Sequence, residues 1–318
     1  QDVTIKELAI KLKISPATVS LALNNDKRVA ADTVRKIKKL AAELNYIPNN
    51  FGRGLQSNRS HLIGYLVDGV TSSFYNELLQ GIGEACSRFK YGLLTGIISK
   101  NPESLTEQVL IFLEKNVDGL VLSRQLPKEI IALIEKRGVP FVFCSVPQDN
   151  SKYTCVKNDD FAGGRVAAEH LVKLGHHFFA CSATQKERLE GNLSVIKQAG
   201  CREVQYKVPS ELAAIMSQKE HPTAIITYSD IEAIEIRHIV TGLGLRVPED
   251  VSIVGTDDLW FAALPEFSFT TVAQAKKRIG EVSVELLLKK INHHKVENTF
   301  LPPELIVRGS TAAPAGKL

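Results

Sequence analysis

The first 45 residues carry hydrophobic positions at helical spacing in three short groups. In the first group, Leu8 and Leu12 lie four residues apart and so share one face of a helix. Thr4 and Glu7 precede them with the spacing of a capping box, in which each side chain bonds the backbone N–H of the other residue. This pattern predicts a helix over residues 4–11.

A second helix is predicted directly after a short turn. Ser15 is a good N-cap, and Pro16 suits the first helical position, where its missing N–H has no intrahelical partner to lose. Val19 and Leu23 then supply one apolar side. Two helices joined by a tight turn within residues 3–23 are typical of a helix-turn-helix.

A third helix is predicted over residues 31–44, where apolar positions again recur at helical spacing. These positions are Val34, Ile37, Leu40, Ala41 and Leu44. The segment 45–49, which contains Pro48, ends this helix. The basic segment 50–59 contains two glycines and is read as either a linker or a marginal helix.

From Leu62 onward, short apolar runs alternate with helical stretches. The apolar runs, read as strands, are 62–67, 93–98, 119–122, 140–144, 178–181, 224–226 and 251–254. The helical stretches are 75–89, 105–115, 128–136, 162–174, 230–243 and 275–291. This alternation predicts right-handed βαβ units and parallel sheets. Because about 250 residues are too many for one sheet, we expect two doubly wound lobes with a cleft at the carboxyl ends of their strands.

Charge is distributed unevenly along the 318 residues. Residues 1–60 hold 11 Lys and Arg against 5 Asp and Glu, a balance of +6. The rest of the chain holds 28 Lys and Arg against 30 Asp and Glu, a balance of −2. A basic module attached to a near-neutral body indicates a polyanionic partner such as nucleic acid.

Cysteine usage and hydropathy bear on the compartment. None of the five cysteines forms a CxxC, and no histidine stands at zinc-ligand spacing beside them, so we expect buried, reduced thiols and neither a metal nor a cofactor. The chain has no run of about 20 apolar residues for a membrane helix, and its first residues do not read as a secretory signal. The expectation is a cytoplasmic protein with no membrane partner.

The small residues of the predicted second helix suit the major groove of DNA. Thr18 and Ser20 can bond phosphates or base edges, whereas Ala17 and Leu21 can contact thymine methyl groups only. An ordinary three-helix domain without a role toward nucleic acid is the alternative. The basic charge of this module favours the DNA-binding interpretation.

Many stretches closely resemble the LacI/GalR family of bacterial transcription regulators, in the family's order. Near the N-terminus they are 3–9, 17–20, 23–24, 44–49 and 53–55. In the body they are 118–122, 161–165, 170–171, 174–176, Arg188 with Gly191, 244–255 and 257–258. Because these stretches span nearly the whole chain, the resemblance is far more specific than a helix-turn-helix match alone.

The resemblance implies three segments. They are an all-α helix-turn-helix headpiece, 1–48, a hinge helix or linker, 49–60, and a two-lobed α/β core of doubly wound parallel sheets, 61–318, like the periplasmic sugar-binding proteins. The implied first lobe comprises about 61–160 and 270–292, and the second about 161–269 and 303–313. The second lobe is short between 191 and 223 compared with the family.

The resemblance also implies which residues meet DNA. Leu55 matches the leucine that wedges between base pairs in the minor groove when the linker becomes helical on the operator. Gly52 replaces the usual alanine, which should cost the hinge helix roughly 0.5–1 kcal/mol and loosen it, unless packing of Phe51 compensates. The candidate contacts are Thr4, Ser15, Pro16, Ala17, Thr18, Ser20, Leu21, Asn24, Arg28, Tyr46, Asn49, Arg53 and Leu55.

For the cleft, the resemblance implies a small-molecule effector, which we expect to be a sugar or sugar derivative. The candidate contacts are Ser73, Phe74, Ser123, Asp159, Arg188, Ser229, Asp257 and Gln274. Phe74 can stack on a ring, Arg188 can bind in bidentate fashion, and Asp257 can accept two hydroxyl bonds. Alternatively, Arg188 and Asp257 form a structural pair between the lobes, and Trp260 packs at an interface rather than on a ligand.

The implied function is that of a sequence-specific DNA-binding transcription regulator, acting as a repressor. It is expected to bind a palindromic operator as a homodimer under allosteric control of the effector. An enzyme is not expected, because the chain contains no P-loop, no GxGxxG after a strand, no GxSxG and no HExxH. The alternatives are a small-molecule binding protein without DNA function, an enzyme on the same scaffold, and a regulator controlled by a protein partner.

Overall fold

The computed structural model divides the chain into two compact units, Gln1–Ser60 and His61–Leu318. The residues that the structure describes are 3–23, 26–46, 59–69, 73–98, 101, 103–146 and 152–315. Within those ranges no helix is long and apolar enough to cross a membrane.

The first unit is a three-helix domain, as the apolar spacing predicts. Its helices are α1 (Ile5–Leu12), α2 (Pro16–Leu23) and α3 (Ala31–Glu43). The predicted capping box opens α1, because the Thr4 N–H donates to Glu7 Oε2 at 2.8 Å and the Glu7 N–H donates to Thr4 Oγ1 at 3.3 Å. The side chains fully buried where the helices meet are Leu8, Val19, Ala22 and Ile37.

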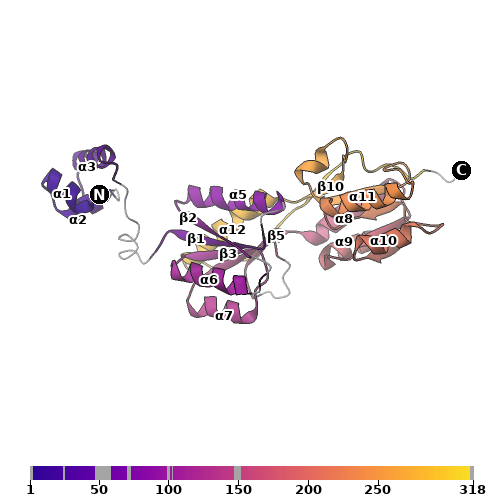
Figure 1. Ribbon diagram of the computed structural model, residues 1–318, viewed down its shortest axis with the longest axis horizontal. Coiled ribbons are helices and arrows are strands. Elements are labelled where there is room, and N and C mark those ends of the chain that lie inside the picture. The colour runs from indigo at the N-terminus through magenta and orange to yellow at the C-terminus, as the bar shows by residue number, and fades with distance from the viewer. Residues whose placement is uncertain are drawn as a thin grey trace. The chain divides into compact units, whose positions relative to one another are not determined.

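The second unit contains two six-stranded sheets, each at the centre of one lobe. In lobe one the strands are β1 (Leu62–Val67), β2 (Gly92–Ile97), β3 (Gly119–Leu122), β4 (Phe141–Cys144), β5 (Cys155–Asn158) and β11 (Thr299–Leu301). They are all parallel, in the order β11-β5-β4-β3-β1-β2. Helices α5 (Ser73–Arg88) and α12 (Lys276–Ile291) cover one face, and α6 (Glu103–Glu114) and α7 (Lys128–Lys136) cover the other (Figure 1).

Lobe two repeats this plan. Its strands are β6 (Phe178–Ser182), β7 (Arg202–Tyr206), β8 (Ala224–Ile226), β9 (Ser252–Asp257), β10 (Thr270–Ala273) and β12 (Glu304–Ile306). Their order is β12-β10-β9-β8-β6-β7, and only the edge pair β10–β12 is antiparallel. Helices α8 (Asp160–Lys173) and α9 (Lys186–Gln198) cover one face, and α10 (Pro209–Met216) and α11 (Asp230–Gly242) cover the other.

The two doubly wound lobes are confirmed, but the chain crosses between them at slightly different places from those expected. β10 pairs with β9 in the second sheet, so the chain returns to lobe one after residue 273 and not at 270. The last crossing falls between β11, which pairs with β5 in lobe one, and β12, which pairs with β10 in lobe two. The pairing of the short strands β10, β11 and β12 therefore sets these boundaries.

Glycines bring the backbones of two helix pairs into direct contact. In lobe one, a Cβ on Gly81 of α5 would lie 2.0 Å from the carbonyl oxygen of Lys277 in α12. In lobe two, a Cβ on Gly164 of α8 would lie 2.0 Å from the carbonyl oxygen of Arg188 in α9. Only glycine permits such an approach. The contact on Arg188 holds the first turns of α8 and α9 together.

Candidate functional site

In the first unit, α2 turns Val19 and Ala22 into the core and leaves its opposite side accessible. The exposed or half-buried residues on that side are Pro16, Ala17, Thr18, Ser20 and Leu21. Ser15 caps the helix, because its Oγ accepts from the Thr18 N–H at 3.1 Å. The structure thus brings the predicted recognition residues together on one accessible side.

The remaining DNA-contact candidates are placed differently. The Arg28 side chain is exposed and bonds Asp26 through Nε at 3.0 Å and Nη2 at 2.8 Å, and these bonds lower the pKa of Asp26 to about 2. Tyr46 packs against the core of the three-helix domain. Four candidates, and Gly52 with them, lie outside the described residues. They are Asn24, Asn49, Arg53 and Leu55.

In the second unit, a pocket of about 200 Å³ lies between the lobes. Its lining residues are Phe74, Tyr75, Ser145, Val146, Lys157, Asn158, Asp160, Gln185, Arg188, Tyr228, Ser229, Ile231, Asp257 and Gln274. Most of them stand at or just after the carboxyl ends of strands, as Asn158 does on β5 and Asp257 on β9. This is where doubly wound sheets bind ligands.

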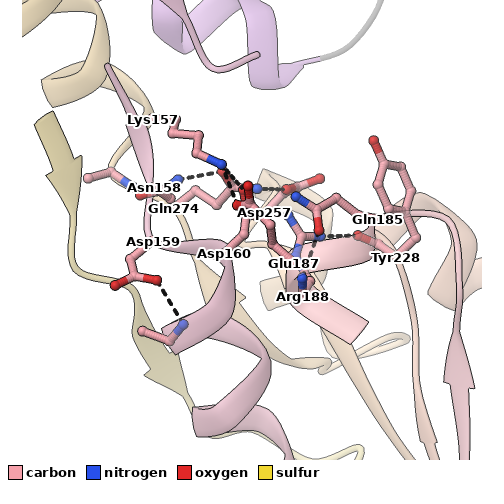
Figure 2. Close-up of polar contacts among 12 residues, drawn as sticks. Lys157, Asn158, Asp159, Asp160, Gln185, Glu187, Arg188, Tyr228, Asp257 and Gln274 are labelled. Atoms are coloured by element: carbon pink, nitrogen blue, oxygen red, sulfur yellow. Dashed lines mark hydrogen bonds and ion pairs between the residues drawn. The ribbon is translucent and has the colours of Figure 1, made fainter. Parts of the chain in front are cut away.

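Four charged side chains, three of which line the pocket, form a balanced cluster (Figure 2). Arg188 Nη2 bonds Asp160 Oδ1 at 2.7 Å, and its Nη1 donates to the Tyr228 carbonyl oxygen at 2.7 Å. Lys157 pairs with Glu187 and lies 3.7 Å from Asp160 Oδ2. Two cations therefore face two carboxylates, and the cluster carries no net charge.

The remaining carboxylate, Asp257, is held by amides rather than by a cation. Gln274 Nε2 donates to Asp257 Oδ1 at 2.5 Å, and Gln274 Oε1 accepts from Asn158 Nδ2. Asn158 Oδ1 in turn accepts from the Ala275 N–H at 3.2 Å. This chain of bonds links β5 of lobe one to β9 of lobe two (Figure 2), and it fixes which end of each amide donates.

Burial raises the pKa of Asp257 to about 7. Nearby Asp230 contributes to this increase in the pKa, whereas Arg188, Lys276 and the bond from Gln274 oppose it. The carboxylate is therefore short of hydrogen-bond donors for its charged form. A ligand that donates to Asp257 would supply them.

Aromatic side chains line the pocket from both lobes. Phe74 and Tyr75 of α5 meet edge to face, with ring centres 5.4 Å apart. Tyr228 of lobe two lies with its ring centre 5.6 Å from the Arg188 guanidinium carbon. Burial raises the pKa of both tyrosines, so their hydroxyls stay neutral donors. The pocket can therefore hold a flat or apolar ring face against these aromatic groups.

Five of the eight predicted effector contacts line this pocket, namely Phe74, Arg188, Ser229, Asp257 and Gln274. The other three have different surroundings. Asp159 caps α8, with its carboxylate accepting from the Ala162 N–H at 2.9 Å. Ser123 is buried and donates to Tyr65 Oη at 3.1 Å. Ser73 begins α5 and is not among the lining residues.

The prediction missed several polar lining residues, above all Asp160, Lys157 and Tyr228. Asp160 directly follows the candidate Asp159, and Tyr228 directly precedes the candidate Ser229, so these two missed residues lie one position from residues that were predicted. The alternative pairing of Arg188 with Asp257 is also replaced, because Arg188 bonds Asp160 instead.

Two further residues of the second unit lie outside the pocket. His176 is 1% exposed and lies within 3.1 Å of Thr223 Oγ1, Ser252 Oγ and the Ala312 carbonyl oxygen. Trp260 is 70% exposed and does not line the pocket. Among the described residues, no group of His, Cys, Asp and Glu is arranged to hold a metal ion.

The sequence and fold are similar to those of known regulators. Residues 4–49 match bacterial regulatory proteins of the lacI family, and residues 168–311 match the periplasmic binding protein-like domain. The chain is 30% identical to the HTH-type transcriptional repressor PurR of Vibrio vulnificus, over 96% of this chain and 97% of that one. It is 29% identical to PurR of Aliivibrio salmonicida, over 96% and 98% of the two chains. Among solved structures, a Lac repressor dimer bound to operator and the anti-inducer ONPF superimposes with a TM-score of 0.85 and 26% identity, over 98% of this chain and 100% of that one.

Proposed function

The chain belongs to the lacI family of bacterial regulatory proteins and is a DNA-binding transcriptional repressor. From this premise, we propose that a small molecule bound between the lobes controls the affinity of the protein for an operator. The operator is proposed to be pseudo-palindromic and the protein a cytoplasmic homodimer, since two-fold protein symmetry matches two half-sites. The accessible side of α2, with Thr18 and Ser20, is proposed to enter the major groove.

The observation that carries the effector proposal is the state of Asp257. Its carboxylate faces the pocket, and among the described residues Gln274 supplies its only side-chain hydrogen bond. The charges of Lys157 and Arg188 are already balanced by Asp160 and Glu187. Among the described lining residues, an anionic ligand would therefore find no cation without a carboxylate partner, whereas a neutral ligand with adjacent hydroxyls would complete the bonding of Asp257.

The proposed ligand is therefore an uncharged sugar or sugar derivative. Its hydroxyls would meet Asp257, and its apolar ring face would lie against Phe74 or Tyr228. A planar heterocycle such as a purine base is the second candidate, because aromatic side chains from both lobes favour a flat ring with N–H donors.

The proposed coupling follows from where the contacts come from. Phe74 and Tyr75 belong to lobe one, and Arg188 and Asp257 belong to lobe two, so a ligand touching both favours one angle between the lobes. The effector shifts operator affinity only as far as it binds one lobe arrangement better than the other.

The test is a titration of genomic DNA fragments at two salt concentrations, with and without panels of neutral sugars and purine bases. Tight binding to one fragment, changed by one compound, would support the proposal and identify the ligand class. Weak and steeply salt-dependent binding to every fragment would mean phosphate contact alone and count against it. Asp257→Asn should abolish the response to the compound, whereas Asp159→Asn, which alters only the cap of α8, should retain it.

A further inference from the structure

A buried lysine at the start of α12 joins the two lobes beside the pocket. Lys276 is 4% exposed, and its ammonium contacts both lobes. It donates to the carbonyl oxygens of Asp257 at 2.5 Å and Asp258 at 3.0 Å, both at the end of β9 in lobe two. It also forms an ion pair with Glu77 Oε1 of α5, in lobe one, at 3.1 Å. The ammonium is therefore hydrogen-bonded to lobe two and ion-paired with lobe one.

The two lobe-two carbonyls belong to a strained turn. Asp257 has a φ of 106° and Asp258 a φ of 49°, in the region that residues other than glycine rarely adopt. Such conformations persist only where their surroundings hold them. Here the ammonium of Lys276 holds both carbonyls, and Arg308 Nη2 holds Asp258 Oδ1 at 2.6 Å.

Lys276 itself is anchored to lobe one. It is the first residue of α12, which packs on α5 through the close approach of Gly81 to the Lys277 carbonyl. Its ion-pair partner Glu77 lies one helical turn after Phe74, which lines the pocket. A rotation of lobe one would therefore move Phe74 and the ammonium of Lys276 together.

We propose that Lys276 is a positioning residue that clamps the Asp257 turn of lobe two from lobe one, so that the presentation of Asp257 to a ligand depends on the angle between the lobes. This proposal rests on the proposed function, because the clamp would connect ligand binding in the pocket to the angle between the lobes. Lobe movement that withdraws the ammonium frees the strained turn. Conversely, a ligand on Asp257 favours the arrangement in which the clamp is made.

The clamp can be tested without any ligand, because Lys276 also acts on the charge of Asp257. The titratable groups that face this carboxylate from the surrounding elements are Tyr75, Arg188, Tyr228, Asp230 and Lys276. Burial is the main cause of the raised pKa of Asp257, about 7, and the ammonium of Lys276 keeps this pKa from rising higher. Removing the ammonium should therefore raise this pKa, and a merely structural role in packing α12 would not move it in a defined direction.

The experiment is a ¹³C NMR titration of aspartate carboxyl groups in the full-length protein, with Asp257→Asn used to assign the signal. Lys276→Met should raise the titration midpoint of Asp257 by about half a pH unit or more. Lys276→Arg should return this midpoint most of the way to its wild-type value. The matched control is Lys277→Met, since the neighbouring Lys277 forms a half-exposed pair with Glu84 at 2.7 Å. It should leave the midpoint unchanged. If Lys276→Met does not fold, Lys276→Gln removes the charge and keeps a donor, with the same expected shift.

An unchanged midpoint in the Lys276 variant, or an equal shift in the Lys277 variant, would overturn the clamp. Where the genomic-fragment titration supplies a compound, Lys276→Met should also reduce the effect of that compound on operator affinity at least fivefold. Failure to find any compound would count against the proposed function. The NMR titration of Asp257 would still test, independently, whether Lys276 acts on Asp257.

Discussion

Arg188 and Asp160 form an ion pair at 2.7 Å in which each side chain is only 11% exposed. The pair joins the first turns of α8 and α9, and the other arm of the guanidinium donates to the Tyr228 carbonyl oxygen at 2.7 Å. Because the protein itself supplies these partners, the guanidinium reaches the pocket with its charge balanced and its orientation fixed. Such a group binds a ligand at little cost in reorganisation.

Replacing Asp160 by Asn should destabilise the second unit by about 3 kcal/mol, because Arg188 and Lys157 lose a shared carboxylate while remaining buried. Asp159→Asn is the matched control, since Asp159 caps α8 through the Ala162 N–H and asparagine caps helices equally well. Urea unfolding of both variants measures the difference. Equal stabilities would show that the ion pair does not hold α8 against α9.

Two adjacent glycines of α8 should respond oppositely to the same substitution. Gly164→Ala places a Cβ 2.0 Å from the Arg188 carbonyl oxygen, so it should cost about 2 kcal/mol or more as α8 and α9 separate. Gly163→Ala meets its nearest atom, on Val272, at 3.6 Å and should stabilise the helix by up to about 1 kcal/mol. Thermal unfolding compares them. A similar gain in stability in both variants would mean that helix propensity, and not close packing, decides the outcome.

The sequence predicted the architecture because strongly periodic segments bury one whole face. It did not predict β5, β7, β10, β11 or β12 as strands. In β7, for example, exposed and half-buried residues at a sheet edge produce no apolar run. The assignment of β10 to lobe two likewise depends on its pairing with β9, which periodicity does not encode. The predicted lobe boundary therefore needed correction at β10, which lies between β9 and the edge strand β12.

Within the site, strand ends could be predicted but the choice between adjacent residues could not. Asp159 occupies the N-cap position, so its carboxylate turns back to its own helix, and Asp160 one residue later faces Arg188. That distinction depends on where α8 begins and how closely α9 approaches it. The burial of His176 likewise depends on a distant segment, because Ala312, 136 residues away along the chain, lies against it.

The buried aspartates give the second unit a pH dependence of defined sign. Burial raises the pKa of Asp257 to about 7 and that of Asp230 to about 6, from an ordinary value of 3.8. The folded state thus binds these protons more tightly than the unfolded state. Their contribution to stability is fully present below about pH 4 and is lost as the pH rises to about 7.

Asp257→Asn should remove part of this loss. Between about pH 5 and pH 8 the variant should lose less stability than the wild type, by at most about 1.4 kcal/mol for each pH unit over which Asp257 titrates. Urea unfolding at both pH values provides the comparison. Parallel pH curves for the two proteins would mean that Asp257 titrates with the same pKa in the folded and unfolded states.

Two serines of the first unit should separate helix stability from DNA contact. Ser15 caps α2 through the Thr18 N–H at 3.1 Å, so Ser15→Ala should lower helix stability by about 1 kcal/mol, seen as faster hydrogen exchange of α2 amides in the full chain. Ser20 lies on the accessible side of α2 and takes no part in the cap. Ser20→Ala should therefore leave amide exchange unchanged and weaken operator binding about fivefold, the loss expected for one hydroxyl bond. Fluorescence anisotropy on an operator fragment measures the binding. Wild-type affinity for Ser20→Ala would remove Ser20 from the interface and leave Thr18 and the exposed small residues of α2 to contact DNA.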